Sequence, residues 1–424
     1  MIKFLIKGLF YDKSRSRLPI IVVATGVMLT VFLNAYITGF MGDTVEMNAR
    51  FTHGHLKVMT KAYAQNSGQR PNDLAITNAT SLMEELSAQY PNLDWSARIL
   101  FGGLVDVPGE DGETKSQGPS TGMAVDLLSP NSLEPKRLNI ENSIVRGRMV
   151  QNQGEALLAE EFAQKLEVNP GDQITLIGST MYGSMSMYNF TVAGTIAFGI
   201  EAMDRGAIII DLEDARLAMD MYDSAGEIIG LFKTGYYNNE TALGISTRFN
   251  QNYLESNDDY DPIMKSLTQQ DNMGQLVGML DVWSIYIISV FIFAMALVLW
   301  NAGLLGGLRR YGEFGVRLAM GEEKSHVYLT LIYESVFIGI AGSVIGTGIG
   351  LAIAAIIQEN GIDISGMMEG SALMFPSQIK TRITPADYYI GFIPGLFSTV
   401  VGAMLAGIGI FKRKTSQLFK ELEA

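Results

Sequence analysis

Hydrophobic positions gather in four long runs along the chain, and polar positions prevail in the stretches between them. An α-helix rises about 1.5 Å per residue, so each run is long enough to cross the roughly 30 Å hydrocarbon core of a bilayer. The first run is too long for the core of a signal peptide and is expected to remain as an anchor. The predicted transmembrane helices cover residues 19–41, 282–307, 330–357 and 387–411.

Residues 42–281, between the first and second runs, show the mixed pattern of a water-soluble domain. Helical spacing predicts a helix at 160–166, and the Gly, Pro and charged residues of 108–122 predict a loop. Short apolar runs predict strands at 156–159, 173–177 and 189–198. The fold class is therefore an α-helical membrane protein with four transmembrane helices, arranged one plus three. A large extracytoplasmic α+β domain is inserted between the first and second helices.

Lys and Arg residues set the expected orientation, because they are hard to translocate in short segments. They cluster in residues 1–18, 308–329 and 412–424, whereas the loop at 358–386 has only Lys380 and Arg382. Both termini are therefore predicted to be cytoplasmic, and residues 42–281 and 358–386 to lie on the outer side of the membrane. Apolar positions within 1–18 predict a cytoplasmic amphipathic helix at the inner surface, or alternatively a helical extension of the first span.

The net charge of the chain argues against two classes of binding partner. The formal net charge is −13, and acidic side chains outnumber basic ones in residues 42–281. An acidic domain is a poor partner for nucleic acid or for anionic lipid head groups, so neither is expected to bind there. The chain has no cysteine, which excludes disulfides.

No motif for catalysis or cofactor binding is found along the sequence. GEEKS at 321–325 lacks the second glycine and the spacing of a phosphate-binding loop. The histidines His53, His55 and His326 are not accompanied by further ligands at metal-site spacing. We predict that the chain has no catalytic residues, binds neither metal nor cofactor, and is not itself an enzyme.

Residues 308–329, between the second and third predicted spans, contain a short amphipathic helix by their spacing. The favourable order of Glu313 and Arg317, four apart, predicts an ion pair, and Gly321 predicts a left-handed helix end. One face of the helix carries Tyr311, Phe314, Leu318 and, at its edge, Ala319. We expect this helix to protrude into the cytoplasm with an aromatic side to bury against a partner. The alternative is a helix that lies on the membrane surface.

The third predicted span carries glycines at positions that share one helical face. Gly342, Gly346 and Gly350 form two overlapping GxxxG steps, which permit close helix approach. This packing site is expected either within the chain or at a dimer seam, and the spacing leaves both open. Glu334 in the same span is expected to pair with a basic side chain near the inner interface, with Arg309, Arg310 and Arg317 as the candidates.

Two stretches carry a resemblance to a known family. RRYGEFGVRLAMGEEKSHVYLTLIYESVF, followed by GIAGSVIGTGIGLAIA, resembles the C-terminal signature of the MacB and FtsX superfamily of ABC-transporter permeases. GRMVQNQGEALLAEEFAQKLEVNPGDQITL resembles the periplasmic core motif of the same superfamily. The resemblance implies that 308–329 is the coupling helix region that contacts an ATPase. The ATPase-coupling residues are expected to be Arg310, Tyr311, Glu313, Phe314, Gly315, Arg317, Leu318 and Gly321.

The same resemblance implies partners and a function. It implies two copies of a separate cytoplasmic ABC ATPase that binds ATP and Mg²⁺, as in the Lol permeases, and a second permease copy or a sister permease in a bacterial inner membrane. ATP hydrolysis is then expected to drive periplasmic movement that extracts or exports a lipoprotein or another hydrophobic substrate, with a periplasmic adaptor as a further candidate partner. The alternative is an FtsX-like regulator that transports nothing. Met181, Met185 and Met187 are weak candidates for substrate contact, and a plain hairpin with one buried face also explains their alternation.

Overall fold

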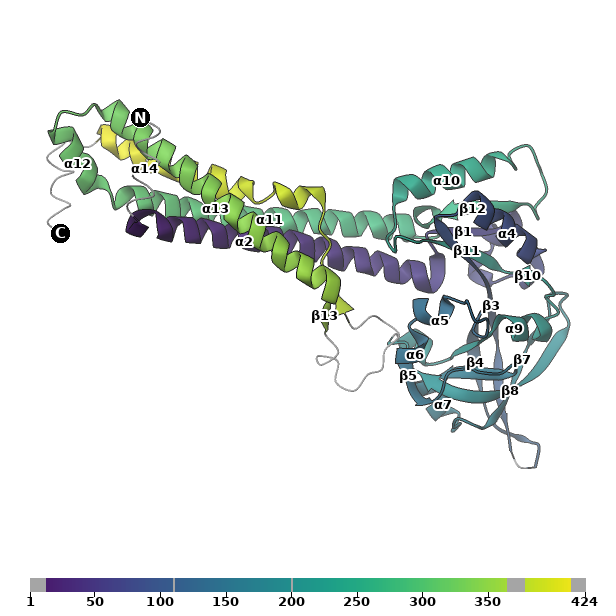
Figure 1. Cartoon of the computed structure of the whole chain (residues 1–424). Helices are drawn as coiled ribbons and strands as arrows, with labels where there is room; N and C mark the ends of the chain where they lie inside the picture. Colours follow the sequence, from purple (N-terminus) through teal and green to yellow (C-terminus); the bar gives the residue numbers. More distant parts are fainter. Residues whose placement is uncertain (1–12, 110, 200, 364–377, 413–424) are drawn as a thin grey trace. The chain divides into compact units, whose positions relative to one another are not determined.

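The computed structural model describes residues 13–109, 111–199, 201–363 and 378–412 (Figure 1). The chain divides into two compact units. The helix unit comprises Met1–Met41, Met279–Ile362 and Ile379–Ala424, and the sheet unit comprises Gly42–Gly278 and Asp363–Gln378. Residues 1–12 of the predicted amphipathic helix, 364–377 of the predicted periplasmic loop and 413–424 of the predicted tail lie outside the described residues.

Four helices are long and apolar enough to span a membrane, one before the inserted domain and three after it, which confirms the predicted fold class. The bounds of the main helices are α2 Lys13–Asn48, α11 Met273–Leu308, α13 Lys324–Asn360 and α14 Thr399–Lys412. A 3-10 turn, η6 Pro385–Tyr388, and a π-helical turn, η7 Ile393–Ser398, precede α14 in the fourth apolar stretch.

Two of these helices are longer than their apolar runs predict. α2 continues past residue 41 to Asn48, and α11 begins at Met273 instead of at residue 282. Both extensions belong to the sheet unit and bury apolar side chains there. The cluster that they share contains Val45, Ala49, Leu231, Leu267, Met273 and Leu276. Hydropathy ends a predicted span where polar residues begin, but packing against a domain continues the helix beyond that point.

The sheet unit is built on a ten-stranded sheet in the order β12-β1-β11-β3-β4-β9-β6-β8-β5, with β7 paired to β3 and β8. β4 runs parallel to β9 and β6 parallel to β8, and the other pairs are antiparallel. The strands are β1 Leu56–Thr60, β3 Leu93–Pro108, β4 Thr114–Val125, β5 Ile144–Gly147, β6 Glu155–Ala159, β7 Gln173–Ser179, β8 Met185–Ile196, β9 Ala207–Asp211, β11 Glu227–Phe232 and β12 Pro262–Ser266.

Short helices and turns cover this sheet and close its connections (Figure 1). The helices are α3 Lys61–Gln65, α4 Ala79–Gln89, α5 Glu134–Arg137, α6 Ile140–Ser143, α7 Glu160–Lys165, α8 Glu201–Asp204, α9 Leu212–Ala218 and α10 Asn239–Gln251. The shorter turns are η1 Ala49–His53, η2 Ser67–Gln69, η3 Asn72–Leu74 and η4 Leu267–Gln269. Two small sheets pair β2 Ile76–Thr77 with β10 Ser224–Ala225, and β13 Ile362–Asp363 with β14 Gln378–Ile379.

The predicted strands and the predicted helix at 160–166 are confirmed by β6, α7, β7 and β8, but the predicted loop at 108–122 is wrong. Residues from Thr114 onward form β4, which pairs with β3 in a long hairpin. Two glycines in β4 lie directly against aromatic rings and leave no space for a side chain. A Cβ at Gly118 would lie 2.8 Å from the Phe162 ring, and one at Gly122 would lie 1.9 Å from the Phe101 ring. These glycines serve packing and do not indicate a loop.

Candidate functional site

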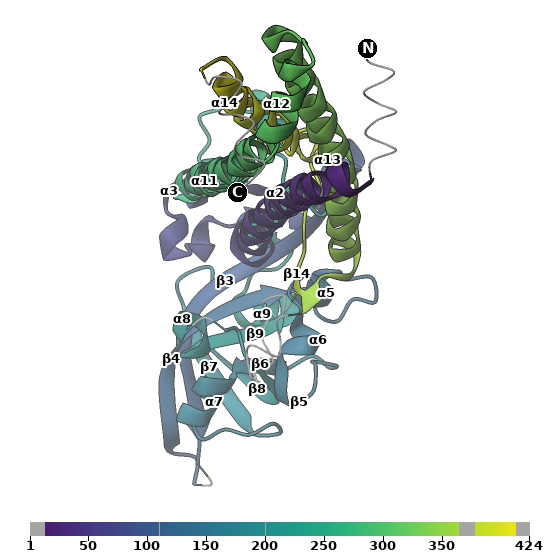
Figure 2. The ribbon, with the colours of Figure 1, turned by 90° about the vertical axis from the view of Figure 1, so that its left-hand side faces the viewer.

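The chain turns between α11 and α13 through α12, Tyr311–Ala319, which lies at the end of α13 (Figure 2). Its aromatic side chains are buried: Tyr311 is 4% exposed and Phe314 is 1% exposed. The Tyr311 hydroxyl donates a hydrogen bond to the Ala406 carbonyl at 2.6 Å. The side chains that pack with them come from α13 and α14 and are Val327, Leu331, Ala403 and Ile410. The expectation that Tyr311 and Phe314 are free to bury in a partner is therefore wrong, because their partner is the same chain.

The outward face of α12 carries aliphatic side chains instead. Val316 is 37% exposed, Met320 is 75% exposed, and Ala319 is also exposed. Leu318 is half-buried at the edge of the aromatic cluster. Helical spacing shows which residues share a face, but it does not show which face the neighbouring helices cover. For that reason the sequence did not single out Val316 and Met320, and it assigned the exposed Ala319 to the aromatic face.

Charged side chains fix both ends of α12. Arg310 lies 2.5 Å from Glu334 of α13 and 3.4 Å from Glu313, which confirms a basic partner for Glu334. Arg317 donates two hydrogen bonds to Glu322, at 2.6 and 2.5 Å, where helical spacing predicted Glu313. Hydrogen bonds from Arg317 hold the pKa of Glu322 below its usual value. Arg310 thus ties the start of α12 to α13, and Arg317 ties its last turn to the connection before α13.

Gly321 ends α12 in the left-handed conformation, as predicted, with φ +93°. The Gly321 N–H donates to the Leu318 carbonyl and the Glu322 N–H donates to the Arg317 carbonyl, both at 3.1 Å. This pair of bonds is the Schellman motif, which satisfies carbonyls at the helix end. Gly315 is buried on the inner side of α12. The geometry therefore defines a stiff corner between α11 and α13.

The three glycines of α13 lie against α2 of the same chain. A Cβ at Gly342 would lie 2.6 Å from Val23, and one at Gly346 would lie 2.4 Å from the Ala24 carbonyl. A Cβ at Gly350 would lie 3.0 Å from the Met28 carbonyl. The two helices therefore approach closely along this seam. Of the two alternatives for the glycines, this arrangement is packing within the chain.

In the sheet unit, the last turns of α2 are held by a buried acid and a histidine. The Glu46 carboxylate accepts a hydrogen bond from the His55 ring nitrogen Nε2 at 3.0 Å and another from the Tyr237 N–H. The His55 Nδ1 accepts from the Phe232 N–H at 2.9 Å, so the ring proton lies on Nε2. His55 is fully buried and Glu46 is 5% exposed. The end of α2 is thus tied to β11 by directional bonds.

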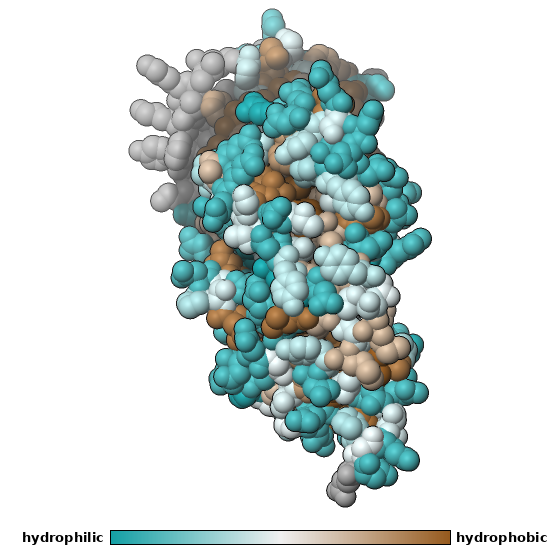
Figure 3. Space-filling model, turned by 90° about the vertical axis from the view of Figure 1, so that its right-hand side faces the viewer, coloured by the Kyte–Doolittle hydropathy of each residue, from teal (hydrophilic) through white to brown (hydrophobic). Residues whose placement is uncertain are grey.

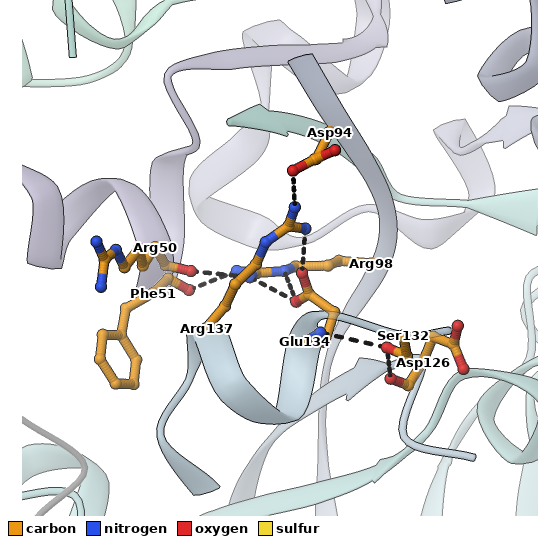
Figure 4. Close-up of polar contacts among 8 residues, drawn as sticks. All are labelled: Arg50, Phe51, Asp94, Arg98, Asp126, Ser132, Glu134 and Arg137. Carbon is orange, nitrogen blue, oxygen red and sulfur yellow. Dashed lines mark hydrogen bonds and ion pairs between the residues drawn. The ribbon is translucent and has the colours of Figure 1, made fainter. Parts of the chain in front are cut away.

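A second buried network holds the turn that follows α2 (Figure 4). Arg98 of β3 is 1% exposed and donates to Glu134 of α5 at 2.7 Å. The same guanidinium donates to the carbonyls of Arg50 and Phe51 in η1, each at 2.8 Å. Arg137 lies 3.1 Å from Glu134 and 3.1 Å from Asp94. The network connects η1 to β3 and α5.

The electrostatics of this network make it sensitive to the loss of a partner. Burial acts to raise the pKa of the Glu134 carboxyl, but the guanidinium groups of Arg98 and Arg137 outweigh it and lower the pKa. Removing one member of a buried ion pair costs about 3–5 kcal/mol. The sequence does show one sign of this network, because Arg98 is a charged residue inside an apolar stretch (ARILF). It does not show that the partner is Glu134, which lies 36 residues further along the chain.

The β7–β8 hairpin carries the methionines singled out by the sequence. Met185 is 76% exposed and Met187 is 65% exposed, whereas Met181 packs partly against the core. Tyr182 in the turn is 79% exposed. The face of the chain drawn in Figure 3 is largely hydrophilic, with hydrophobic side chains in small patches. More and less exposed side chains do alternate along the hairpin, but Met185 and Met187 lie on its exposed face.

Among the described residues, no group of three or more His, Cys, Asp or Glu side chains is placed to hold a metal ion. Two exposed candidates for contact with other molecules are the outward face of α12 and the exposed face of the hairpin. Both are apolar and neither brings together groups for acid-base or nucleophilic chemistry.

Two family models match the sequence. The model of the MacB-like periplasmic core domain matches residues 20–245, and the model of the FtsX-like permease C-terminal region matches residues 285–415. Curated proteins give no match to the chain.

Two solved structures are similar to the chain at low identity. One is the crystal structure of the periplasmic region of MacB from Actinobacillus actinomycetemcomitans, with a TM-score of 0.35 and 10% identity over 54% of this chain and 93% of that one. The other is a domain of a permease protein from Porphyromonas gingivalis, with a TM-score of 0.32 and 10% identity over 52% of this chain and 93% of that one.

Proposed function

The chain belongs to the family of FtsX-like permeases that carry a MacB-like periplasmic core domain, and from this premise we propose that it is the permease subunit of an ABC transporter. ATP and Mg²⁺ are bound and ATP is hydrolysed by a separate cytoplasmic subunit, present in two copies. The permease pairs with a second copy or with a sister permease in the inner membrane of a bacterium. Its work is to turn that hydrolysis into movement of the periplasmic domain.

The proposed contact with the ATPase is the outward face of α12. Val316, Ala319 and Met320 are exposed there on a helix whose other side is fixed by the buried Phe314. A force applied to this face passes into α13 and α14, because the Tyr311 and Phe314 side chains are packed between them. Arg310, Glu313 and Arg317 then act as positioning residues that hold α12 in place. This rigid docking of α12 is the observation that carries the proposal.

The proposed output lies in the sheet unit. α2 and α11 contribute residues to both units, so movement of either helix acts on the residues at its end. There the Glu46 and Arg98 bonds resist slippage between helix and sheet. The substrate that we propose is a lipoprotein or another hydrophobic molecule, and the exposed Met185 and Met187 support contact with an apolar surface, because methionine adapts to varied shapes.

The test compares two methionines of nearly equal exposure, Met320 at 75% and Met185 at 76%. A Met320→Asp variant should still insert into the membrane but lose the ABC ATPase that copurifies with the native protein, because a carboxylate cannot be desolvated in an apolar contact. Met185→Asp is the matched control and should retain the ATPase. The readouts are mass spectrometry of copurifying proteins and vanadate-sensitive ATP hydrolysis in the purified complex. Full retention of the ATPase by Met320→Asp would contradict the proposed contact.

Substrate transport is tested separately with the control variant. Met185→Asp should retain the ATPase but release less lipid-anchored protein from spheroplasts than the native complex does. If release is unchanged in both variants, the complex does not extract lipoproteins, and the FtsX-like regulatory function becomes the better description.

A further inference from the structure

The helix unit contains a cavity of about 410 Å³ between the inner parts of its four helices. This volume lies within the roughly 300–1,000 Å³ of small-molecule sites. Its walls are mostly apolar, and three glycines of α11 form one of them. The lining residues used in the argument are Leu18, Leu305, Gly306, Arg309, Arg310 and Glu334.

The lining of the cavity is mostly apolar, with basic side chains along one edge. Leu18 is 62% exposed and Leu305 is 54% exposed, so the rim is made of side chains that favour lipid over water. Arg309 and Arg310 lie at the end of α11, where the apolar run stops. An apolar chamber that ends in cations matches a molecule with a hydrocarbon chain and an anionic head.

The residues that line the cavity carry one more positive than negative charge. Among the lining residues, Arg309 and Arg310 carry two positive charges and Glu334 one negative charge. Arg310 is 2.5 Å from Glu334 and 3.4 Å from Glu313, which does not line the cavity, so Arg309 is the cation without an acidic neighbour in the lining. The side chain of Arg309 is exposed and makes no hydrogen bond or ion pair with any of the residues that the structure describes. A single phosphate diester would therefore be neutralised at this end. Basic pockets between membrane helices on the cytoplasmic side are known to hold anionic lipid head groups.

We propose that this cavity binds one anionic glycerophospholipid of the inner leaflet, with an acyl chain between α2, α11 and α13 and its phosphate on Arg309. The lipid fills space that the four helices leave open and ties the end of α11 to its neighbours. The proposal does not depend on the ATPase contact, and it concerns the helix unit alone.

Gly306 provides a specific way to close the cavity. A Cβ at Gly306 meets nothing within 4 Å, whereas at its neighbours Gly303 and Gly307 a Cβ would lie 2.9 Å from Thr399 and 2.5 Å from Ala406. Gly306→Phe therefore fills the chamber without a backbone clash. Gly348 of α13 also has nothing within 4 Å of its Cβ and does not line the cavity, so Gly348→Phe is the matched control.

The experiment measures binding of dioleoyl-phosphatidylglycerol and dioleoyl-phosphatidylcholine to the full chain by native mass spectrometry in detergent. The native chain and Gly348→Phe should retain one phosphatidylglycerol with a roughly fivefold preference over phosphatidylcholine, the effect of one cation near a membrane surface. Arg309→Ala should remove the preference and keep binding. Gly306→Phe should reduce binding of both lipids.

Several results would overturn the proposal. Equal retention of the two lipids by the native chain would remove the anionic selectivity. The same lipid binding in Gly306→Phe and Gly348→Phe would place the lipid outside the cavity. Binding that begins only after residues 1–12 are deleted, or only when a homodimer is dissociated, would assign the cavity to that segment or to a second copy of the chain.

Discussion

α12 buries its aromatic side chains, whereas the β7–β8 hairpin exposes its methionines, although both segments have an apolar face. α12 lies in a corner between two returning helices, and α13 and α14 cover one side of it. The first residues of β8, Met185–Asn189, pair with β7. β6 pairs with β8 only from Thr191 onward. The first segment has neighbours for its apolar face, and the tip of the second extends beyond its neighbours.

This difference separates two uses of an apolar face. Phe314 is part of the structure that holds a corner stiff, and its replacement acts on folding. Met185 contributes little to the fold, and its replacement acts on contacts with other molecules. Stability measurements on matched variants can therefore test the assignment of each face without knowledge of the partner.

The largest effect is expected from Phe314→Ala. Truncating a fully buried Phe costs about 3–5 kcal/mol through lost burial and the cavity left behind. The purified variant in detergent should aggregate at a clearly lower temperature than the native chain in a heating series followed by size-exclusion chromatography. Val316→Ala, on the outward face of the same helix, is the control and should shift the midpoint far less. Equal shifts for the two would mean that α12 is not docked by its aromatic side.

A smaller loss is expected from Gly321→Val. The φ of +93° disfavours any residue with a Cβ and costs roughly 1–3 kcal/mol. No side-chain clash adds to this cost, because a Cβ at Gly321 would have no other atom within 4 Å. Gly348→Val, in an ordinary helical conformation, should not lower the midpoint by a comparable amount. A neutral Gly321→Val would indicate that the corner can adopt another turn.

Tyr311→Phe should lower the free energy of unfolding by a smaller amount, about 0.5–1.5 kcal/mol. The substitution removes the hydrogen bond to the Ala406 carbonyl and keeps the ring. The midpoint in the same heating series should fall between those of the native chain and Phe314→Ala. Hydrogen exchange at the amides near Ala406 should increase in this variant. Unchanged exchange there would show that the bond does not hold α14 to α12.

The smallest effect is expected from Met185→Ser and Met187→Ser, which should change stability by no more than about 0.5 kcal/mol. These side chains are 76% and 65% exposed, so little apolar surface is lost from the fold. The measurement is urea unfolding followed by tryptophan fluorescence in a Trp283→Phe, Trp300→Phe background, where Trp95 is the remaining tryptophan and reports on the sheet unit. A loss comparable to that of Phe314→Ala would show that the hairpin face is covered within the chain.

The sequence was sufficient for features that depend on local spacing. Hydropathy located the four spans, and Gly321 and the strand-helix order around Phe162 followed from turn and periodicity rules. Features that depend on distant partners were not predictable. The partner of Arg98 lies in α5, and the glycines of β4 read as a loop because the rings that need the space, Phe101 and Phe162, come from other elements.

The seam between α2 and α13 has the same repeat on both helices. Val23, Val27 and Val31 face Gly342, Gly346 and Gly350, and both series recur every four residues. A slide of four residues, about 6 Å, would bring each valine toward the next glycine and leave two of the three pairs engaged. Intermediate positions would press valine against backbone or larger side chains. The four-residue repeat would therefore set the length of any sliding step between the two helices.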